Sequence, residues 1–272
     1  MGGHTSCVSI AHDDGPACLL LDAGTGITRT QPSLGAGPFR GTVILGHLHW
    51  DHVIGLPFFE AGDREDARVD LLLPAQGQPA ESLLARLMSP PLFPITPSQL
   101  RGTWTFDTYD EGHRDCEGFA VRALEIPHGG GRTMGLRVSD GTHVLAYLSD
   151  HAPQFLGPGR QGVGELHRNA LELAAGADLL IHDAQYTAAE LARRGNFGHA
   201  AAEYAVLLAR EAGVRGLLLS HHDPARTDAE VVALTAAAQA WGRPGLTVGF
   251  AREDLVLDLS SEHALRSIVP AS

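Results

Sequence analysis

"TVILGHLHWDH", residues 42–52, places three histidines and one aspartate directly behind an apolar run. Val43–Leu45 predicts a buried strand, and the glycine that follows predicts a break into a loop. Imidazole nitrogens and carboxylate oxygens are the groups that bind zinc and similar divalent ions in proteins. The loop therefore predicts a metal site, and its candidate ligands are His47, His49, Asp51 and His52.

Four later apolar runs also end in histidine or aspartate. They are LEIPH (124–128), LAYLSD (145–150), LLIHD (179–183) and LLLSHHD (217–223), and each predicts a strand. Ligands of open α/β sheets bind outside the carboxyl ends of the strands, where such residues can converge. The further candidates for a polar site are therefore His128, Asp150, Asp183, His221 and His222.

The order of the expected elements predicts the fold class. Helices are expected at residues 78–88, 165–176, 199–213 and 228–241. Strands with few helices come first, and strands alternate with helices in the second half. Two packed sheets with helices outside them satisfy this order, which places the chain in the α/β (α+β) class. No repeat or linker divides the sequence, so we expect one domain over residues 1–272.

The composition of the chain limits the kinds of partner and location that we expect. The chain carries a formal net charge of −12. Affinity for long nucleic acid comes mostly from basic side chains that neutralise phosphates, so we expect no long nucleic acid and a small anionic substrate. Three widely spaced cysteines without a C-x-x-C motif predict a reducing, cytoplasmic location. No apolar run approaches the roughly 20 residues that span a bilayer, so no membrane partner is expected.

The segment HLHWDH, residues 47–52, resembles the H-x-H-x-D-H signature of the metallo-β-lactamase superfamily. The upstream LLLDAG and the later strand ends follow in the order of that superfamily over nearly the whole chain. The resemblance implies a four-layer αββα sandwich, the metallo-β-lactamase fold, with two divalent metal ions at one edge. Zinc (Zn²⁺) is the first expectation for these ions, with Mn²⁺ or Fe²⁺ as alternatives.

The resemblance also implies a ligand for each position of the site. The ligands are His47, His49 and His128 for one ion, Asp51, His52 and His221 for the other, and Asp150 for both. Asp22 would support the signature loop from behind. Spacing back from Pro224 favours His221 over the adjacent His222 as the ligand, and His222 would then contact a ligand or lie at the surface.

The second half of the chain resembles the ribonuclease Z and phosphodiesterase branch of the superfamily. The resemblance rests on HDA (182–184), GHA (198–200) and SHHDP (220–224). In that branch a histidine at the position of His199 faces the scissile phosphate, and Asp183 would orient it. Ribonuclease Z carries a long arm that grips tRNA, whereas the corresponding residues 153–164 form a short segment here. We therefore expect no tRNA processing.

The predicted activity is that of a dinuclear metal-dependent hydrolase acting on a small phosphodiester. Two ions would lower the pKa of a bridging water and hold the reacting phosphate in line. Asp51, Asp150 and His199 are the expected catalytic residues, with Arg132 and Arg226 as candidate phosphate contacts. A lactonase or other carboxylic-ester hydrolase would use the same ligands, and a metal-binding sensor without turnover is the third alternative. A homodimer is compatible with the resemblance.

Overall fold

The computed structural model describes residues 2–13, 15–242, 244–261 and 264–268. The chain divides into two compact units. The first, here the N-terminal unit, holds residues 4–110 and 115–118, and the second, the C-terminal unit, holds residues 1–3, 111–114 and 119–272. Both units contain a β-sheet and helices, which confirms the α/β class. The expectation of one domain over the whole chain stays a prediction.

A five-stranded sheet in the order β1-β2-β3-β4-β5 forms the N-terminal unit. Its strands are β1 (Val8–Ile10), β2 (Leu19–Leu21), β3 (Arg40–Ile44), β4 (Arg68–Pro74) and β5 (Thr103–Tyr109), and its α-helices are α1 (Gln31–Leu34), α2 (Trp50–Val53) and α3 (Ala80–Ala85). Only β1 pairs antiparallel with its neighbour. Leu20, Val43 and Leu71 of the central strands are fully buried and belong to one apolar core.

The parallel pairing of β2 with β3 positions the signature loop. Leu21 lies opposite Ile44, so both strands end at the same edge of the sheet. The backbone N–H of Asp22 then donates to the carbonyl of Ile44 over 2.9 Å. The carboxylate behind β2 and the histidines behind β3 therefore lie at one edge because of the strand register.

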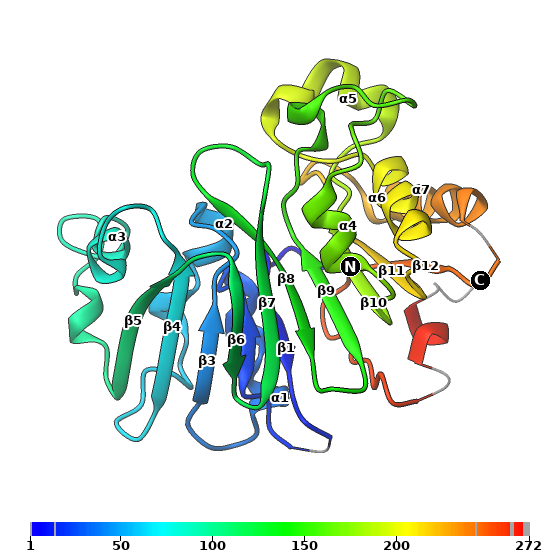
Figure 1. Ribbon diagram of the computed structural model, residues 1–272. Helices are drawn as coiled ribbons and strands as arrows, with labels where there is room; N and C mark the ends of the chain where they lie inside the picture. The colour runs from blue at the N-terminus through cyan, green and yellow to red at the C-terminus, as the bar shows by residue number, and fades with distance from the viewer. Residues whose placement is uncertain (1, 14, 243, 262–263, 269–272) are drawn as a thin grey trace. The chain divides into compact units, whose positions relative to one another are not determined.

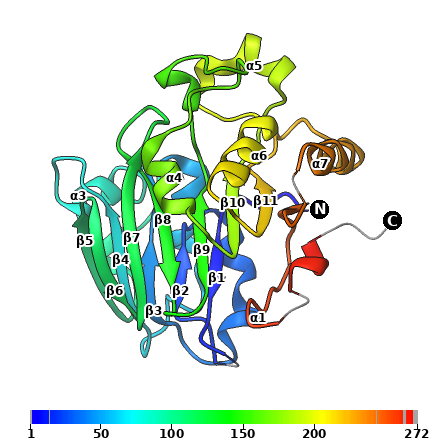
Figure 2. The same cartoon turned by 45° about the vertical axis from the view of Figure 1, so that its right-hand side comes forward.

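The C-terminal unit contains a seven-stranded sheet in the order β12-β11-β10-β9-β8-β7-β6. Its strands are β6 (Gly112–Cys116), of which residues 112–114 belong to this unit, β7 (Phe119–Ile126), β8 (Thr133–Ser139), β9 (Val144–Leu148), β10 (Leu179–Asp183), β11 (Gly216–Ser220) and β12 (Thr247–Phe250). Its α-helices are α4 (Arg168–Ala174), α5 (Ala188–Arg194), α6 (Ala202–Glu211) and α7 (Asp228–Trp241). In this unit α4, α6 and α7 lie along the sheet (Figures 1 and 2).

Alanines allow these helices to lie close to the sheet. Ala170 and Ala174 of α4 and Ala205 and Ala209 of α6 are fully buried in the core of this unit. Strands β9, β10 and β11 pair parallel, while β8 pairs antiparallel with both β7 and β9, so β7 runs parallel to β9. The carboxyl ends of β7, β9, β10 and β11 therefore meet at one edge of the sheet.

Most expected elements are confirmed, with some differences. The helix expected at residues 199–213 begins at Ala202, because Ala201 forms a parallel bridge with Tyr186 and holds the preceding residues extended. Strands β1, β5 and β6 and helices α1, α2 and α5 were not expected. Among the described residues no helix has the length and apolar character required to cross a membrane. The cytoplasmic location stays a prediction.

Candidate metal centre

The signature loop brings its polar residues together within the N-terminal unit. His47 and His52 are buried, and His49 and Asp51 are partly exposed. The His47 ring lies 4.6 Å from that of His49 and 4.1 Å from that of His52, measured between ring centroids. One nitrogen of His47 lies within 4.8 Å of one nitrogen of His49. Imidazole nitrogens at this spacing, as those of His47 and His49, can share one cation.

Asp22 holds this loop from behind. Its Oδ1 accepts a hydrogen bond from the backbone N–H of Gly46 over 2.7 Å, and its Oδ2 lies 2.7 Å from Nδ1 of His52. The proton of His52 therefore lies on Nδ1, and Nε2 keeps its lone pair. That Nε2 lies 3.3 Å from Oδ2 of Asp51, another acceptor. Outer carboxylates that orient metal-binding histidines have this arrangement.

Replacing Asp22 with alanine is expected to destabilise the protein by about 2–6 kcal/mol. The substitution leaves two buried donors, the N–H of Gly46 and Nδ1–H of His52, without their acceptor, at roughly 1–3 kcal/mol each. Chemical denaturation monitored by circular dichroism measures the change. The control is Asp66→Ala, which removes an exposed ion pair with Arg64 and should cost less than about 1 kcal/mol. Equal effects of both substitutions would contradict the role of Asp22.

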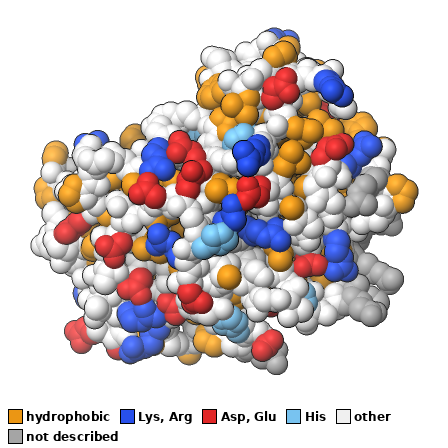
Figure 3. Space-filling view, in the orientation of Figure 1, with side chains coloured by type: hydrophobic (Ala, Val, Ile, Leu, Met, Phe, Trp, Pro, Cys, Tyr) orange, Lys and Arg blue, Asp and Glu red, His pale blue; other side chains and the backbone are white. Residues whose placement is uncertain are grey.

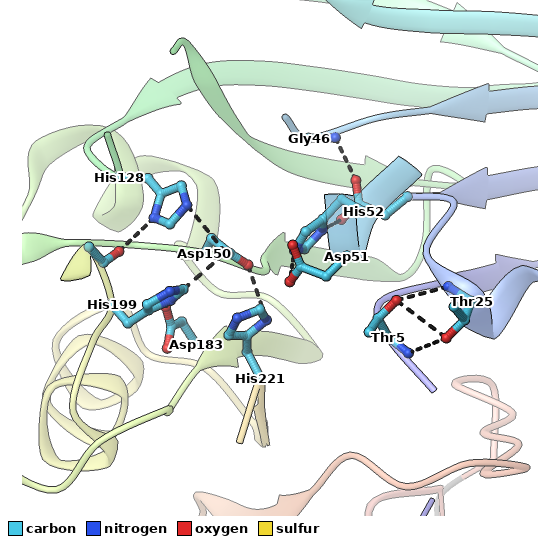
Figure 4. A network of polar contacts seen from close by, with 12 residues as sticks. Thr5, Thr25, Gly46, Asp51, His52, His128, Asp150, Asp183, His199 and His221 are labelled. Carbon is cyan, nitrogen blue, oxygen red and sulfur yellow. Dashed lines mark hydrogen bonds and ion pairs between the residues drawn. The ribbon is translucent and has the colours of Figure 1, made fainter. Parts of the chain in front are cut away.

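The C-terminal unit places a second polar cluster at the edge where its parallel strands end. Asp150 follows β9 and is 1% exposed. Its Oδ2 lies 3.4 Å from Nε2 of His128, which follows β7, and its Oδ1 lies 3.3 Å from Nδ1 of His221, which follows β11 (Figure 4). The two oxygens of one buried carboxylate thus face two imidazoles on opposite sides.

His128 is held in one tautomer. Its Nδ1 lies 2.6 Å from the carbonyl oxygen of Gly198, so the proton lies on Nδ1 and donates to that carbonyl. Nε2 therefore directs a lone pair toward Asp150, an arrangement that a cation between the two groups stabilises. Gly198 is required for this contact: its φ is +92°, and a Cβ there would lie 2.5 Å from the carbonyl oxygen of His128.

His199 forms a pair with Asp183 in the same cluster. Its Nδ1 lies 2.8 Å from Oδ2 of Asp183 and 3.8 Å from Oδ2 of Asp150. The backbone N–H groups of His151 and Gln185 also donate to the carboxylate of Asp183, over 3.1 and 3.0 Å. Asp183 is fully buried, so these hydrogen bonds hold it and, through it, the orientation of the His199 ring.

His221 and His222, the two adjacent candidate ligands, differ in their contacts and their surroundings. His221 has φ of +55° at the end of β11, and its ring approaches Asp150 and stacks on His199 with centroids 4.7 Å apart. A positive φ is uncommon outside glycine and often occurs at functional sites. Burial lowers the pKa of His222 to about 4, with Arg226 and His221 adding to the shift, so His222 is neutral at physiological pH.

The sequence did not reveal a buried histidine pair behind the cluster. His151 and His182 are fully buried, and Nδ1 of His151 lies 3.0 Å from Nε2 of His182. Burial is the first cause that lowers the pKa of both rings. Nδ1 of His182 also lies 2.7 Å from the carbonyl oxygen of Asp183. The only sequence signal was that both histidines lie beside an aspartate at a strand end.

The two candidate phosphate contacts have other partners in the structure. Arg132 donates to Glu125 over 3.0 Å. Arg226 donates to Glu190 and to the carbonyl of Gln185 over 2.8 and 3.1 Å. Both arginines are thus neutralised by a neighbouring carboxylate, and their contact with phosphate stays a prediction.

A family model described as the beta-lactamase superfamily domain matches residues 18–222, which include every residue of both clusters. The chain belongs to the metallo-β-lactamase superfamily. The metallo-β-lactamase fold protein YhfI from Bacillus subtilis, a solved structure, superposes with a TM-score of 0.67 at 20% identity and covers 91% of this chain and 88% of its own. This likeness confirms the expected fold.

Curated relatives of this metallo-β-lactamase chain identify its branch. Ribonuclease Z of Bradyrhizobium sp. (strain ORS 278) is 28% identical and matches over 79% of this chain and 83% of its own length. Ribonuclease Z of Salinibacter ruber is 29% identical, over 81% and 82%. The chain is therefore a metal-dependent hydrolase of the ribonuclease Z/phosphodiesterase-like branch, with a nuclease- or phosphodiesterase-like activity.

The same relatives correct one expectation. The expectation of no long nucleic acid partner is wrong, because these metallo-β-lactamase relatives are named for action on RNA. Net charge does not exclude a nucleic acid partner, because the value of −12 sums over the whole chain. Recognition of a phosphate depends on the charges that lie near it, and salt at cellular concentration screens exposed charges more than about 8–10 Å away.

The family and the histidine and aspartate clusters together support divalent metal ions as the cofactor. The donor set is chemically suited to this. Neutral imidazoles with fixed tautomers and carboxylates are the ligands of zinc and related ions, whereas sites for magnesium and calcium use oxygen alone. The number and identity of the ions stay predictions.

Proposed function

We propose that this chain is a two-metal phosphodiesterase that hydrolyses phosphodiester bonds of RNA. The observation that carries the proposal is the Asp183–His199 pair beside Asp150, in a chain similar to proteins named ribonuclease Z. A small phosphodiester, the substrate expected from the sequence, requires the same chemistry and stays a prediction. The lactone or carboxylic-ester alternative also stays a prediction, since the same ligands serve it.

The ligands that we propose are those implied by the superfamily: His47, His49, Asp51 and His52 from the N-terminal unit, and His128, Asp150 and His221 from the C-terminal unit. Zinc in structural and catalytic sites takes three or four protein ligands. Two ions therefore require six to eight ligands, and we propose these seven residues as that set. Zinc is our first assignment, because five of the seven residues are histidines.

The residues of the chain have separate roles in this proposal. Bound ions would act as Lewis acids that stabilise charge on the phosphate and lower the pKa of water. His199 would donate a proton to the leaving oxygen or stabilise its developing charge. Asp183 accepts from Nδ1 of His199 and so directs Nε2 of that ring away from itself. Asp51 and Asp150 would hold the ions through their carboxylate oxygens.

Metal dependence tests the proposal. Protein stripped with a chelator is expected to lose its hydrolysis of bis(p-nitrophenyl) phosphate and to regain it when Zn²⁺ or Mn²⁺ is added. Release of p-nitrophenolate measures the rate, and elemental analysis measures the bound metal. Full activity in the stripped protein would contradict the proposal. So would the absence of activity in protein with two bound ions per chain.

A further inference from the structure

Two exposed aromatic rings lie close to the catalytic cluster of the C-terminal unit. Phe155 belongs to the 3-10 helix η4 (Pro153–Leu156) and is 50% exposed, and Phe197 belongs to η5 (Gly195–Phe197) and is 64% exposed. Exposed rings of this size lose favourable burial unless another group covers them. We call these two residues the aromatic rim.

Both rings are fixed to the segments that carry His128 and His199. A Cβ built on Gly129 would lie 3.3 Å from Cε2 of Phe155, so this ring lies against the residue that follows His128. Phe197 precedes Gly198, whose carbonyl accepts from Nδ1 of His128, and it lies two positions before His199. The aromatic rim is therefore continuous with the cluster.

The two short helices also contact each other. A Cβ on Gly195, at the start of η5, would lie 3.3 Å from Oε1 of Gln154 in η4. Gln154 in turn donates to the carbonyl of Gly162 over 2.8 Å and so holds the loop behind η4. Figure 3 shows hydrophobic side chains gathered on the surface around α5, the helix that leads into η5. The two rings thus lie on short helices that are held by contacts with neighbouring segments.

We infer that the aromatic rim stacks against a nucleobase attached to the phosphate that is cleaved. This inference rests on the proposed function, because it places the scissile phosphate beside His128, Asp150 and His199. Every nucleobase has a flat face, and aromatic side chains beside positive charge are the usual means of binding single-stranded nucleic acid without sequence preference. The exposed Arg193 lies two positions before η5 and supplies that charge.

Charge and position both favour a nucleobase over another apolar partner. Arg194 is ion-paired with Asp223 and lies 5.8 Å above the ring of Tyr186, measured to its centroid. The Tyr186 ring lies 6.1 Å from that of His199. Arg194 is thus held beside these rings, and the exposed Arg193 next to it offers the positive charge that an anionic ligand with an aromatic group requires.

The test compares two substrates that share one leaving group. Thymidine 5′-(p-nitrophenyl phosphate) carries a nucleobase, and methyl p-nitrophenyl phosphate does not. Phe155→Leu and Phe197→Leu keep apolar bulk and remove the ring, and the double variant combines them. Since loss of one stacking partner weakens binding by about 5- to 150-fold, we expect kcat/KM for the thymidine ester to fall about tenfold or more. The methyl ester should change less than about twofold.

Two sets of control variants distinguish stacking on a base from a general loss of activity. Trp241→Ala removes an exposed aromatic side chain of α7 and should leave both substrates unchanged. Phe155→Tyr and Phe197→Tyr keep a ring and should restore the preference for the thymidine ester. Calorimetric binding of thymidine 5′-monophosphate, which requires no turnover, should weaken in the leucine variants by the same factor.

The results separate this inference from the proposed function. If the wild-type protein hydrolyses both esters and the leucine variants reduce them equally, the aromatic rim does not stack on a base and the inference is overturned. Unchanged binding of the nucleotide in the double variant also overturns it. Failure of the metal-loaded wild-type protein to hydrolyse either ester overturns the proposed function and this inference with it.

Discussion

Replacement of Asp150 with alanine is expected to reduce kcat/KM for bis(p-nitrophenyl) phosphate by about 10³-fold or more. Metal ions contribute several kcal/mol to stabilising charge on a transition-state phosphate. Each 1.36 kcal/mol of activation free energy corresponds to a factor of ten in rate. Asp150 is a buried carboxylate that the C-terminal unit places against both His128 and His221. Its loss should therefore also lower the number of metal ions bound per chain, which elemental analysis measures.

Asp178→Ala is the matched control for this experiment. Asp178 belongs to the same unit, and its carboxylate accepts from the backbone N–H of Val144 and from Arg215. Its loss removes hydrogen bonds but no candidate ligand, so activity and metal content should stay within about twofold of wild type at a temperature where the variant is folded. An Asp150→Ala protein that keeps its metal and its activity would contradict the ligand assignment.

Replacement of His199 with alanine is expected to lower kcat by about 10²- to 10⁴-fold and to leave the metal content unchanged, as is typical when a positioned proton donor is lost. The effect should depend on the leaving group. A p-nitrophenolate leaves without a proton, whereas an alkoxide requires one. The loss should therefore be larger for a dinucleotide than for bis(p-nitrophenyl) phosphate.

Asp183→Asn and His113→Ala complete this series. Asp183→Asn keeps the shape of the side chain but weakens the acceptor that holds His199, so an intermediate loss in kcat is expected. His113 lies on β6 and contacts Arg122, and its substitution should have no effect on kcat. A loss of bound metal in His199→Ala would show that this histidine is a ligand and would contradict its assigned role.

The sequence predicted the strand ends well because a local rule controls them. A buried apolar run that ends in histidine or aspartate places that residue at the edge of a sheet, as seen for Asp150 and His221. The sequence also contains a local pattern that predicts the start of α5. Thr187 and Glu190 form a capping box, in which each side chain bonds to the backbone of the other.

Other features depend on contacts between distant residues and could not be read from the sequence. Helix α6 begins after His199 because Ala201 is extended and forms a bridge with Tyr186. The pair of His151 and His182 joins residues that follow or end two neighbouring strands, and no spacing along the chain predicts it. The ring contact of Phe155 with Gly129 is likewise produced by the fold.

The most direct measurement is the cleavage of a defined, end-labelled single-stranded RNA by chelator-stripped protein after metal is added back. We predict cleavage by the metal-loaded wild-type protein and none by Asp150→Ala purified in parallel. Cleavage should persist where the 2′-hydroxyl next to the cleaved bond is methylated, because the proposed chemistry uses water and not that hydroxyl. Equal cleavage by both proteins, or no cleavage by wild-type protein with two bound ions per chain, would contradict the account.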